Sequence, residues 1–529
     1  MKKTSLYWLL TLVALVTSSC DNYLDINANP NSAISASAQL VLPQAIVSAA
    51  GLSSSYNNYG AHFGGYMANA GGFSGFGNLL NYNLVTGDYN GLWVNTYDNL
   101  QDFKYVIDQT EGVEGQGYFN ATAKIMTVLD FARLVDAFGN VPYSEALLGN
   151  AGRTPKYDDA ATIYQDLVVK LDAAIAAIDA AKFPLALNSS SDPLFKGNMT
   201  TWKQFANTLK LRLLIRMSGV SALSSFVTTK FAALDKTLGF LTTDAIVNPG
   251  YIKQDGKQNP TWGTWGYTVA GALANSSRIP TQFAFGFYKG QKLTDTGRGT
   301  VIYKNFASTT APTPINQLGN ESNAPAIIAS YSTWYTGTFN SASSITDALG
   351  VLKGPSMGQP IMLASEAYFL QAEAQLKGYL PGTFATSFDQ GITQSFTYLY
   401  KDVTNVVGAG KNVTADVATY KTDNATSYLV NIALATTNEQ RLEAIITQKY
   451  IALNMINSEE GWNEYRRTGY PKTDPAGNGY TNIASNKSNS TRPDKLPTRI
   501  LYPSSEQSYN AANFKAVNQF ADLIFWDPN

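Results

Sequence analysis

The sequence has one cysteine, Cys20, and one histidine, His62, in 529 residues. A lone cysteine excludes a disulfide within the chain. A lone histidine excludes a metal site built on two histidines. A Ser-His-Asp triad would have to use His62, and no Gly-x-Ser-x-Gly turn supplies its serine. These absences weigh against the commonest hydrolase and metalloenzyme centres.

Charge is also scarce. Charged residues make up 15% of the chain and the net charge is -1, against about 25% charged residues in an average soluble domain. No basic cluster is large enough to neutralise a phosphate backbone, so nucleic acid is not an expected partner. No Gly-x-x-x-x-Gly-Lys phosphate loop is present, and no cofactor is expected. Polarity comes from Asn, Ser, Thr, Gly and 31 Tyr, which suits neutral ligands such as sugars or peptides.

No apolar run reaches the about 20 residues that a membrane-spanning helix needs. The longest candidate, 6–16, follows Lys2 and Lys3 and precedes "TSSC". This pattern predicts a signal peptide over 1–19, acylation of Cys20, and a polar tether over 20–40. Thr17 stands where lipoprotein signals usually carry Leu, so ordinary cleavage that leaves Cys20 free is the alternative.

Apolar residues at helical spacing predict helices within 91–109, 120–142, 158–180, 200–219, 360–378 and 439–467. Trp93 and Trp202 lie on the apolar stripes and are expected in the core. Alanine-rich helix pairs joined by short turns are typical of tetratricopeptide-like units, although no strict 34-residue period is found. We expect a mainly α fold of tetratricopeptide-like helical repeats, with long irregular loops and a few short strands, forming one compact domain over 41–529.

Three long stretches, 54–90, 245–345 and 465–515, show no sustained helical or strand period. The stretch 54–77 contains aromatic residues among Gly and Asn and has no charged residue. Two further groups of aromatic residues surround Trp262 and Trp334. A ring stacked on a pyranose contributes about 1–2 kcal/mol. The alternative is that the rings pack against the scaffold or a partner protein. The ligand-contact candidates are Tyr56, Tyr59, Phe63, Tyr66, Phe73, Phe76, Trp262, Trp265, Tyr267, Tyr331, Trp334 and Tyr335.

Acidic residues gather in "EEGWNEYRR", where Glu459, Glu460 and Glu464 precede Arg466 and Arg467. A carboxylate pair of this kind could hydrolyse glycosides. We favour an ion-pair network that holds the following loop, and no catalytic residue is assigned.

Glu366 and Glu373 lie seven residues apart on one helical face, and they too could act in acid–base chemistry or form ion pairs. We favour buried pairing with an arginine. Asp and Asn oxygens in "DNYLDINANPN" could bind a structural calcium ion, but without EF-hand spacing. No metal ligand is assigned.

Several segments, in this order, resemble the SusD/RagB family of nutrient-binding outer-membrane lipoproteins. They are "YLDINANPN", "LVDAFGNVPYSEAL", "PKYDDAATIYQDL", "LASEAYFLQAEAQLKG", "EAIITQKYIALNMINSEEGWNEYRRTGYP" and "RPDKLPTRILYPSSEQSYNAANF". The resemblance implies a cell-surface lipoprotein of a Gram-negative bacterium, attached to the outer membrane only by its lipid anchor. It implies that the protein binds an oligosaccharide and delivers it to a SusC-like TonB-dependent transporter. The alternatives are a peptide-binding lid of such a transporter, a lid whose rings serve only the transporter interface, and a surface glycan-degrading enzyme.

Overall fold

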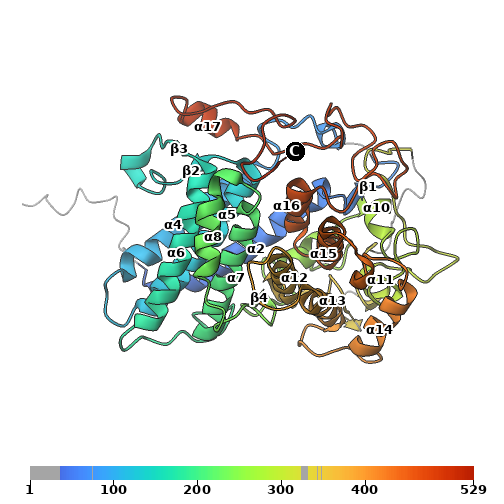
Figure 1. The fold of residues 1–529 in the computed structure, drawn as a ribbon, viewed down its shortest axis with the longest axis horizontal. Coiled ribbons are helices and arrows are strands. Elements are labelled where there is room, and N and C mark those ends of the chain that lie inside the picture. Colours follow the sequence, from blue (N-terminus) through green and yellow to red (C-terminus); the bar gives the residue numbers. More distant parts are fainter. Residues whose placement is uncertain (1–35, 74–75, 323–331, 342–343, 347, 529) are drawn as a thin grey trace, which may run out of the picture.

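The computed structural model describes residues 36–73, 76–322, 332–341, 344–346 and 348–528. Helices dominate these residues (Figure 1). They are α2 (Ala38–Phe63), α3 (Asn78–Asn81), α4 (Asn90–Thr110), α5 (Gly117–Phe138), α6 (Ala160–Ala180), α7 (Met199–Met217), α8 (Ser224–Ala232), α9 (Pro260–Trp265), α10 (Gln282–Phe285), α11 (Thr296–Ile302), α12 (Ala364–Leu376), α13 (Phe384–Tyr400), α14 (Val413–Asp423), α15 (Asn438–Ala452), α16 (Ser458–Thr468) and α17 (Ser504–Tyr509). None of these described helices is long and apolar enough to cross a bilayer.

The strands form four two-stranded antiparallel sheets. These are β1 (Met67–Asn69) with β5 (Arg278–Pro280), β2 (Val141–Pro142) with β3 (Tyr157–Asp158), β4 (Ala245–Val247) with β8 (Gln359–Met362), and β6 (Thr338–Ser341) with β7 (Ser344–Thr346). In the β2–β3 pair Val141 lies opposite Asp158 and Pro142 lies opposite Tyr157. It brings the end of α5 next to the start of α6.

The helices pack in sequential antiparallel pairs. In one group α4 contacts α5, α5 contacts α6 and α6 contacts α7; in the other α12 contacts α13 and α15 contacts α16. Helix α2 contacts α4, α5 and α16, and α7 contacts α12, so the two groups share one core (Figure 1). The predicted fold class is therefore confirmed: a mainly helical single domain with a few short strands.

Local signals explain the helices that the sequence predicts. Helix α6 begins where the Asp159 carboxylate accepts a hydrogen bond from the Thr162 amide at 2.9 Å, which satisfies one free N–H of the first turn. Its Ile163 and Leu167 are buried against α5 and α7. Helix α5 ends at Gly139, whose φ of 76° is unfavourable for other residues. Trp93 and Trp202, on the apolar stripes of α4 and α7, are buried as predicted.

The interpretation of 54–63 as loop is wrong. These residues complete α2, and Tyr56, Tyr59 and Phe63 follow the i, i+3, i+7 spacing of one helical face. Gly60 lies where α2 crosses α16 closely, and it does not form a turn. A Cβ there would lie 2.0 Å from the Glu459 backbone nitrogen of α16, so only glycine lets the two backbones approach this closely.

The predicted helical run over 439–467 is two helices, α15 and α16. The break falls at 453–457, where Met455 has a φ of 59°. The Met455 amide donates to the Ser458 hydroxyl at 3.1 Å, and the Asn457 amide group donates to the Ile361 carbonyl at 3.0 Å. These bonds replace the helical ones that are lost, and the stretch contains no Gly or Pro that would mark the break in the sequence.

Candidate functional site

The aromatic residues proposed to contact a ligand lie mainly inside the fold. The prediction that their rings face solvent is wrong for Tyr56, Tyr59, Phe63, Tyr66, Phe76, Trp262, Trp265, Tyr267 and Trp334, whose exposed fractions lie between 1% and 8%. Phe73 and Tyr335 are partly buried, and Tyr331 lies outside the described residues. In this conformation the buried rings offer no face for a sugar to stack on.

The buried rings are large, mainly apolar groups, so burial is favourable for them. Tyr66 stacks on Tyr450 with ring centres 4.1 Å apart, and each hydroxyl donates to a backbone carbonyl. Trp265 and Trp334 do come together, edge to face at 5.3 Å, but within the core. The Trp265 Nε1 donates to the Asn58 side chain of α2 at 2.8 Å.

His62 also belongs to the core. Its Nε2 lies 3.0 Å from the Leu79 carbonyl oxygen, and burial lowers the pKa of the ring to about 4. The ring is therefore neutral at physiological pH, with a structural contact rather than a catalytic partner.

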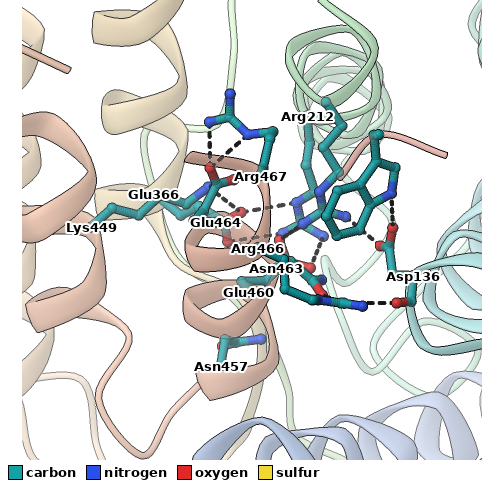
Figure 2. A network of polar contacts seen from close by, with 12 residues as sticks. Asp136, Arg212, Glu366, Lys449, Asn457, Glu460, Asn463, Glu464, Arg466 and Arg467 are labelled. Atoms are coloured by element: carbon teal, nitrogen blue, oxygen red, sulfur yellow. Dashed lines mark hydrogen bonds and ion pairs between the residues drawn. The ribbon is translucent and has the colours of Figure 1, made fainter. Parts of the chain in front are cut away.

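The clustered acidic residues form a buried ion network between helices, as favoured from the sequence (Figure 2). Arg212 of α7 donates from Nε and Nη2 to the two carboxylate oxygens of Glu366, both at 2.9 Å. Arg467 of α16 pairs in the same way with Glu373, at 2.8 and 2.7 Å. Both predicted arginine pairings are confirmed.

The network extends through Glu460 and Glu464. Glu460 pairs with Arg216, and the Lys449 ammonium lies 3.0 Å from a Glu464 oxygen. Although burial acts to raise it, the Arg467 and Lys449 charges hold the pKa of Glu464 well below its ordinary value. These carboxylates are therefore ionised and engaged in joining α5, α7, α12, α15 and α16.

An open hollow of about 500 Å³ lies where three parts of the chain meet. Strands β2 and β3 bring 139–142 and 155–158 together, and the C-terminal segment 499–525 crosses them, at the top of Figure 1. The Tyr502 hydroxyl donates to the Asn140 carbonyl at 2.6 Å. Asn513 donates to the Thr154 carbonyl at 2.9 Å. These bonds fix the C-terminal segment over the strand pair.

The lining of this hollow combines rings, amides and charges. Partly exposed rings come from Tyr157, Phe514 and Phe525, while the buried Tyr502 ring packs edge to face against Tyr157 at 5.0 Å. The side chains of Asn140 and Asn513 add amide groups, and Arg499 adds a guanidinium group. The volume and the mixture of apolar surface with a few polar groups are typical of small-ligand sites. We name this site the C-terminal hollow.

These lining residues are not among the site residues predicted from the sequence, although the sequence contains a signal for them. The two segments that meet here, "LVDAFGNVPYSEAL" and "RILYPSSEQSYNAANF", are among those that carry the family resemblance. They are more than 350 residues apart. The hydrophobic periodicity within each segment does not indicate that Asn140 and Tyr502 are in contact.

Two family models match the chain. Residues 29–252 match a model described as starch-binding and associating with the outer membrane. Residues 339–523 match a model described as SusD and RagB outer membrane lipoprotein. The chain belongs to the SusD/RagB family. The family descriptions place it at the outer membrane and make it a nutrient-binding protein.

Solved structures agree with this SusD/RagB assignment. A SusD homologue from Bacteroides uniformis is similar over 92% of this chain and 99% of its own, at 24% identity and a TM-score of 0.66. A chitin-binding SusD homologue from Flavobacterium johnsoniae covers 91% of this chain and 99% of its own, at 22% identity and a TM-score of 0.65. A further chitin-binding protein covers 93% and 99%, at 23% identity and a TM-score of 0.67. At these identities the likeness establishes the fold.

No curated protein matches the SusD/RagB chain. Within the described residues no three His, Cys, Asp or Glu side chains gather as metal ligands. The predicted signal peptide, Cys20 and the "DNYLDINANPN" stretch lie outside the described residues.

Proposed function

We propose that this protein is a cell-surface lipoprotein that binds an oligosaccharide in the C-terminal hollow and delivers it to a SusC-like TonB-dependent transporter. Acylation of Cys20 would hold it on the outer membrane. The observation that carries the proposal is the hollow itself, a site of about 500 Å³ with partly exposed rings and amide groups, in a member of a nutrient-binding family.

The lining suits sugar chemistry. A sugar presents apolar C–H faces to the Phe514 and Tyr157 rings, and its hydroxyls can donate to the amide oxygen of Asn513, whose Nδ2 already donates within the protein. Each stacked ring contributes about 1–2 kcal/mol. Because binding also immobilises the sugar, two or three rings lead to dissociation constants of roughly micromolar to millimolar. Such affinities let a capture protein release its cargo to a transporter.

The proposal describes a binder rather than an enzyme. Among the acidic residues that could suggest glycoside hydrolysis, Glu366, Glu460 and Glu464 are engaged by arginine and lysine between helices. Glu459 is buried at the start of α16, with 3% of its surface exposed. None of them lines the hollow. Asp522 is the one carboxylate among its lining residues, so a pair of acids facing each other across a sugar is not available there.

The test measures binding of an oligosaccharide panel to the purified protein by calorimetry, with Phe514→Ala as the site variant. Loss of the ring should weaken binding about 5- to 30-fold, as expected from about 1–2 kcal/mol. Phe183→Ala is the matched control, since this ring is 86% exposed and does not line the hollow. The proposal fails if no oligosaccharide binds, or if Phe183→Ala weakens binding as much as Phe514→Ala.

Two further experiments test location and partner. Replacement of Cys20 by Ala should release the protein from the outer membrane fraction. Affinity purification from detergent-solubilised outer membranes should recover a large β-barrel transporter with the wild-type protein. If the barrel is absent, the delivery role is contradicted, while oligosaccharide capture stands on the binding measurements.

A further inference from the structure

Arg499 is an unusual lining residue of the C-terminal hollow. Its side chain is 6% exposed, and its Cζ lies 5.0 Å from the centre of the Tyr502 ring. It therefore places a charged group in the wall of an open site rather than at the protein surface. Burial of a charge is costly unless partners compensate it.

The guanidinium group of Arg499 has little compensation from the protein. Nε donates to the Ile500 carbonyl at a long 3.5 Å, and the buried Nη2 has no hydrogen-bond partner. Among the described residues no carboxylate forms a salt bridge with it. By contrast, the buried Arg212, Arg298 and Arg467 each pair closely with Glu or Asp. A buried donor left unpaired in a site is a position where a ligand supplies the missing acceptor.

The backbone beside Arg499 leaves room for this group. A Cβ at Gly139 would lie 3.0 Å from the Arg499 Nη1, and this glycine also lines the hollow. With a φ of 76°, residue 139 is in the left-handed region, which favours glycine. The end of α5 thus permits the guanidinium group to lie against the backbone.

Two further cationic side chains line the hollow beside Arg499. Lys156 and Lys515 line it and are exposed, and Asp522 is the single acidic lining residue. Lys156 forms an exposed salt bridge with Glu145 at 3.1 Å, while Lys515 forms none among the described residues. With Lys156 paired to Glu145, Arg499 and Lys515 against Asp522 leave one positive charge in excess, which favours a ligand that carries negative charge.

We propose that Arg499 binds a carboxylate group of the ligand, so that the C-terminal hollow takes an acidic oligosaccharide that contains uronic acid. This inference rests on the proposed function, since it names the ligand class of the same site. The guanidinium fork matches a carboxylate with two parallel hydrogen bonds. The rings of Tyr157 and Phe514 would bind the sugar face, which favours a uronate over a peptide carboxylate.

The test compares a uronic-acid trisaccharide with the same trisaccharide after reduction of its carboxyl groups, by calorimetry on the full protein. Wild type should bind the acidic sugar at least about ten-fold more tightly, since hydrogen bonds to charged groups contribute about 1.5–3 kcal/mol. Its affinity should fall as salt rises, whereas that for the neutral sugar should not. Arg499→Gln should remove the preference and keep the neutral-sugar affinity.

A second variant covers the case in which Arg499→Gln does not fold. Lys515→Gln alters an exposed rim residue and should weaken only the acidic sugar, about two- to five-fold. Equal wild-type affinity for both trisaccharides would overturn the acidic preference and leave oligosaccharide binding intact. Binding of neither sugar, or tighter binding of an acidic peptide than of the uronate, would overturn the proposed function together with this inference.

Discussion

Glu459, at the start of α16, provides a sharp test of the buried electrostatics. Burial, together with the neighbouring Glu460, raises the pKa of its carboxyl to about 8, from an ordinary value of 4.5, although Arg133 and Arg212 oppose the shift. Its Oε2 is buried and has no hydrogen-bond partner. The folded protein therefore keeps this proton at neutral pH, whereas the unfolded chain releases it.

The sign and size of the effect follow from this difference. Below pH 4.5 both states of Glu459 are protonated, and the group causes no pH-dependent loss of stability. Between pH 4.5 and about 8 only the unfolded chain loses the proton, so the free energy of unfolding falls by about 1.4 kcal/mol per pH unit. At pH 7 the accumulated loss is about 3 kcal/mol. Glu459→Gln removes the titrating group and should abolish this loss.

The assay is urea unfolding of wild type and Glu459→Gln at a series of pH values between 4 and 8. The variant should gain stability relative to wild type as pH rises, by about 3 kcal/mol between pH 4 and pH 7. Glu114→Gln is the control, because it makes the same chemical change at an exposed glutamate. Parallel stability curves for wild type and Glu459→Gln would refute the reasoning.

Three further variants test the packing. Gly60→Ala would place a Cβ 2.0 Å from the Glu459 backbone nitrogen, so it should lower the free energy of unfolding by at least about 2–3 kcal/mol in urea titrations; an unchanged midpoint would contradict the close crossing. Arg467→Ala leaves the buried Glu373 carboxylate without its main partner and should cost about 3–5 kcal/mol, most visibly at neutral pH; thermal melting checks it, and a cost below 1 kcal/mol, the size expected for an exposed pair, argues against burial of the pair. Trp262→Ala, at a ring 1% exposed, should lower stability by about 3–5 kcal/mol, and loss of ligand binding in a variant that is as stable as wild type would restore the ligand-contact hypothesis.

Local periodicity predicted most of the long helices because each buries one regular face. In α6 the Asp159 cap and the stripe through Ile163 and Leu167 lie within a single stretch of sequence, so no distant contact is needed to recognise them. Helix α2 is not among the helices predicted from the sequence, because Gly60 and the surrounding Asn and Ser residues have weak helix propensity. Its crossing with α16 overrides that propensity, and the crossing involves a partner about 400 residues away.

The difference between local pattern and distant contact also explains why the aromatic residues were placed wrongly. Composition alone does not tell whether a ring on a glycine-rich stretch points outward or inward, since that depends on the partner it meets. Tyr66 meets Tyr450, and Trp265 meets Trp334, through contacts that no local pattern encodes. The paired acids were predicted correctly because burial of a carboxylate on a helical face requires a cation, whatever its position in the chain.

Buried arginines in this fold are of two kinds: those that join helices and one that lines the C-terminal hollow. Where helices must be joined, as at Arg212 and Arg467, the guanidinium group is paired with a carboxylate and its electrostatic cost is met within the protein. At Arg499 the chain buries the same group in the wall of a hollow, where Nη2 has no hydrogen-bond partner and no described carboxylate forms a salt bridge with it. Such a group destabilises the free protein, and a carboxylate from a ligand would relieve that cost. Binding and stability are then coupled, so a uronate should raise the melting temperature of wild type more than that of Arg499→Gln.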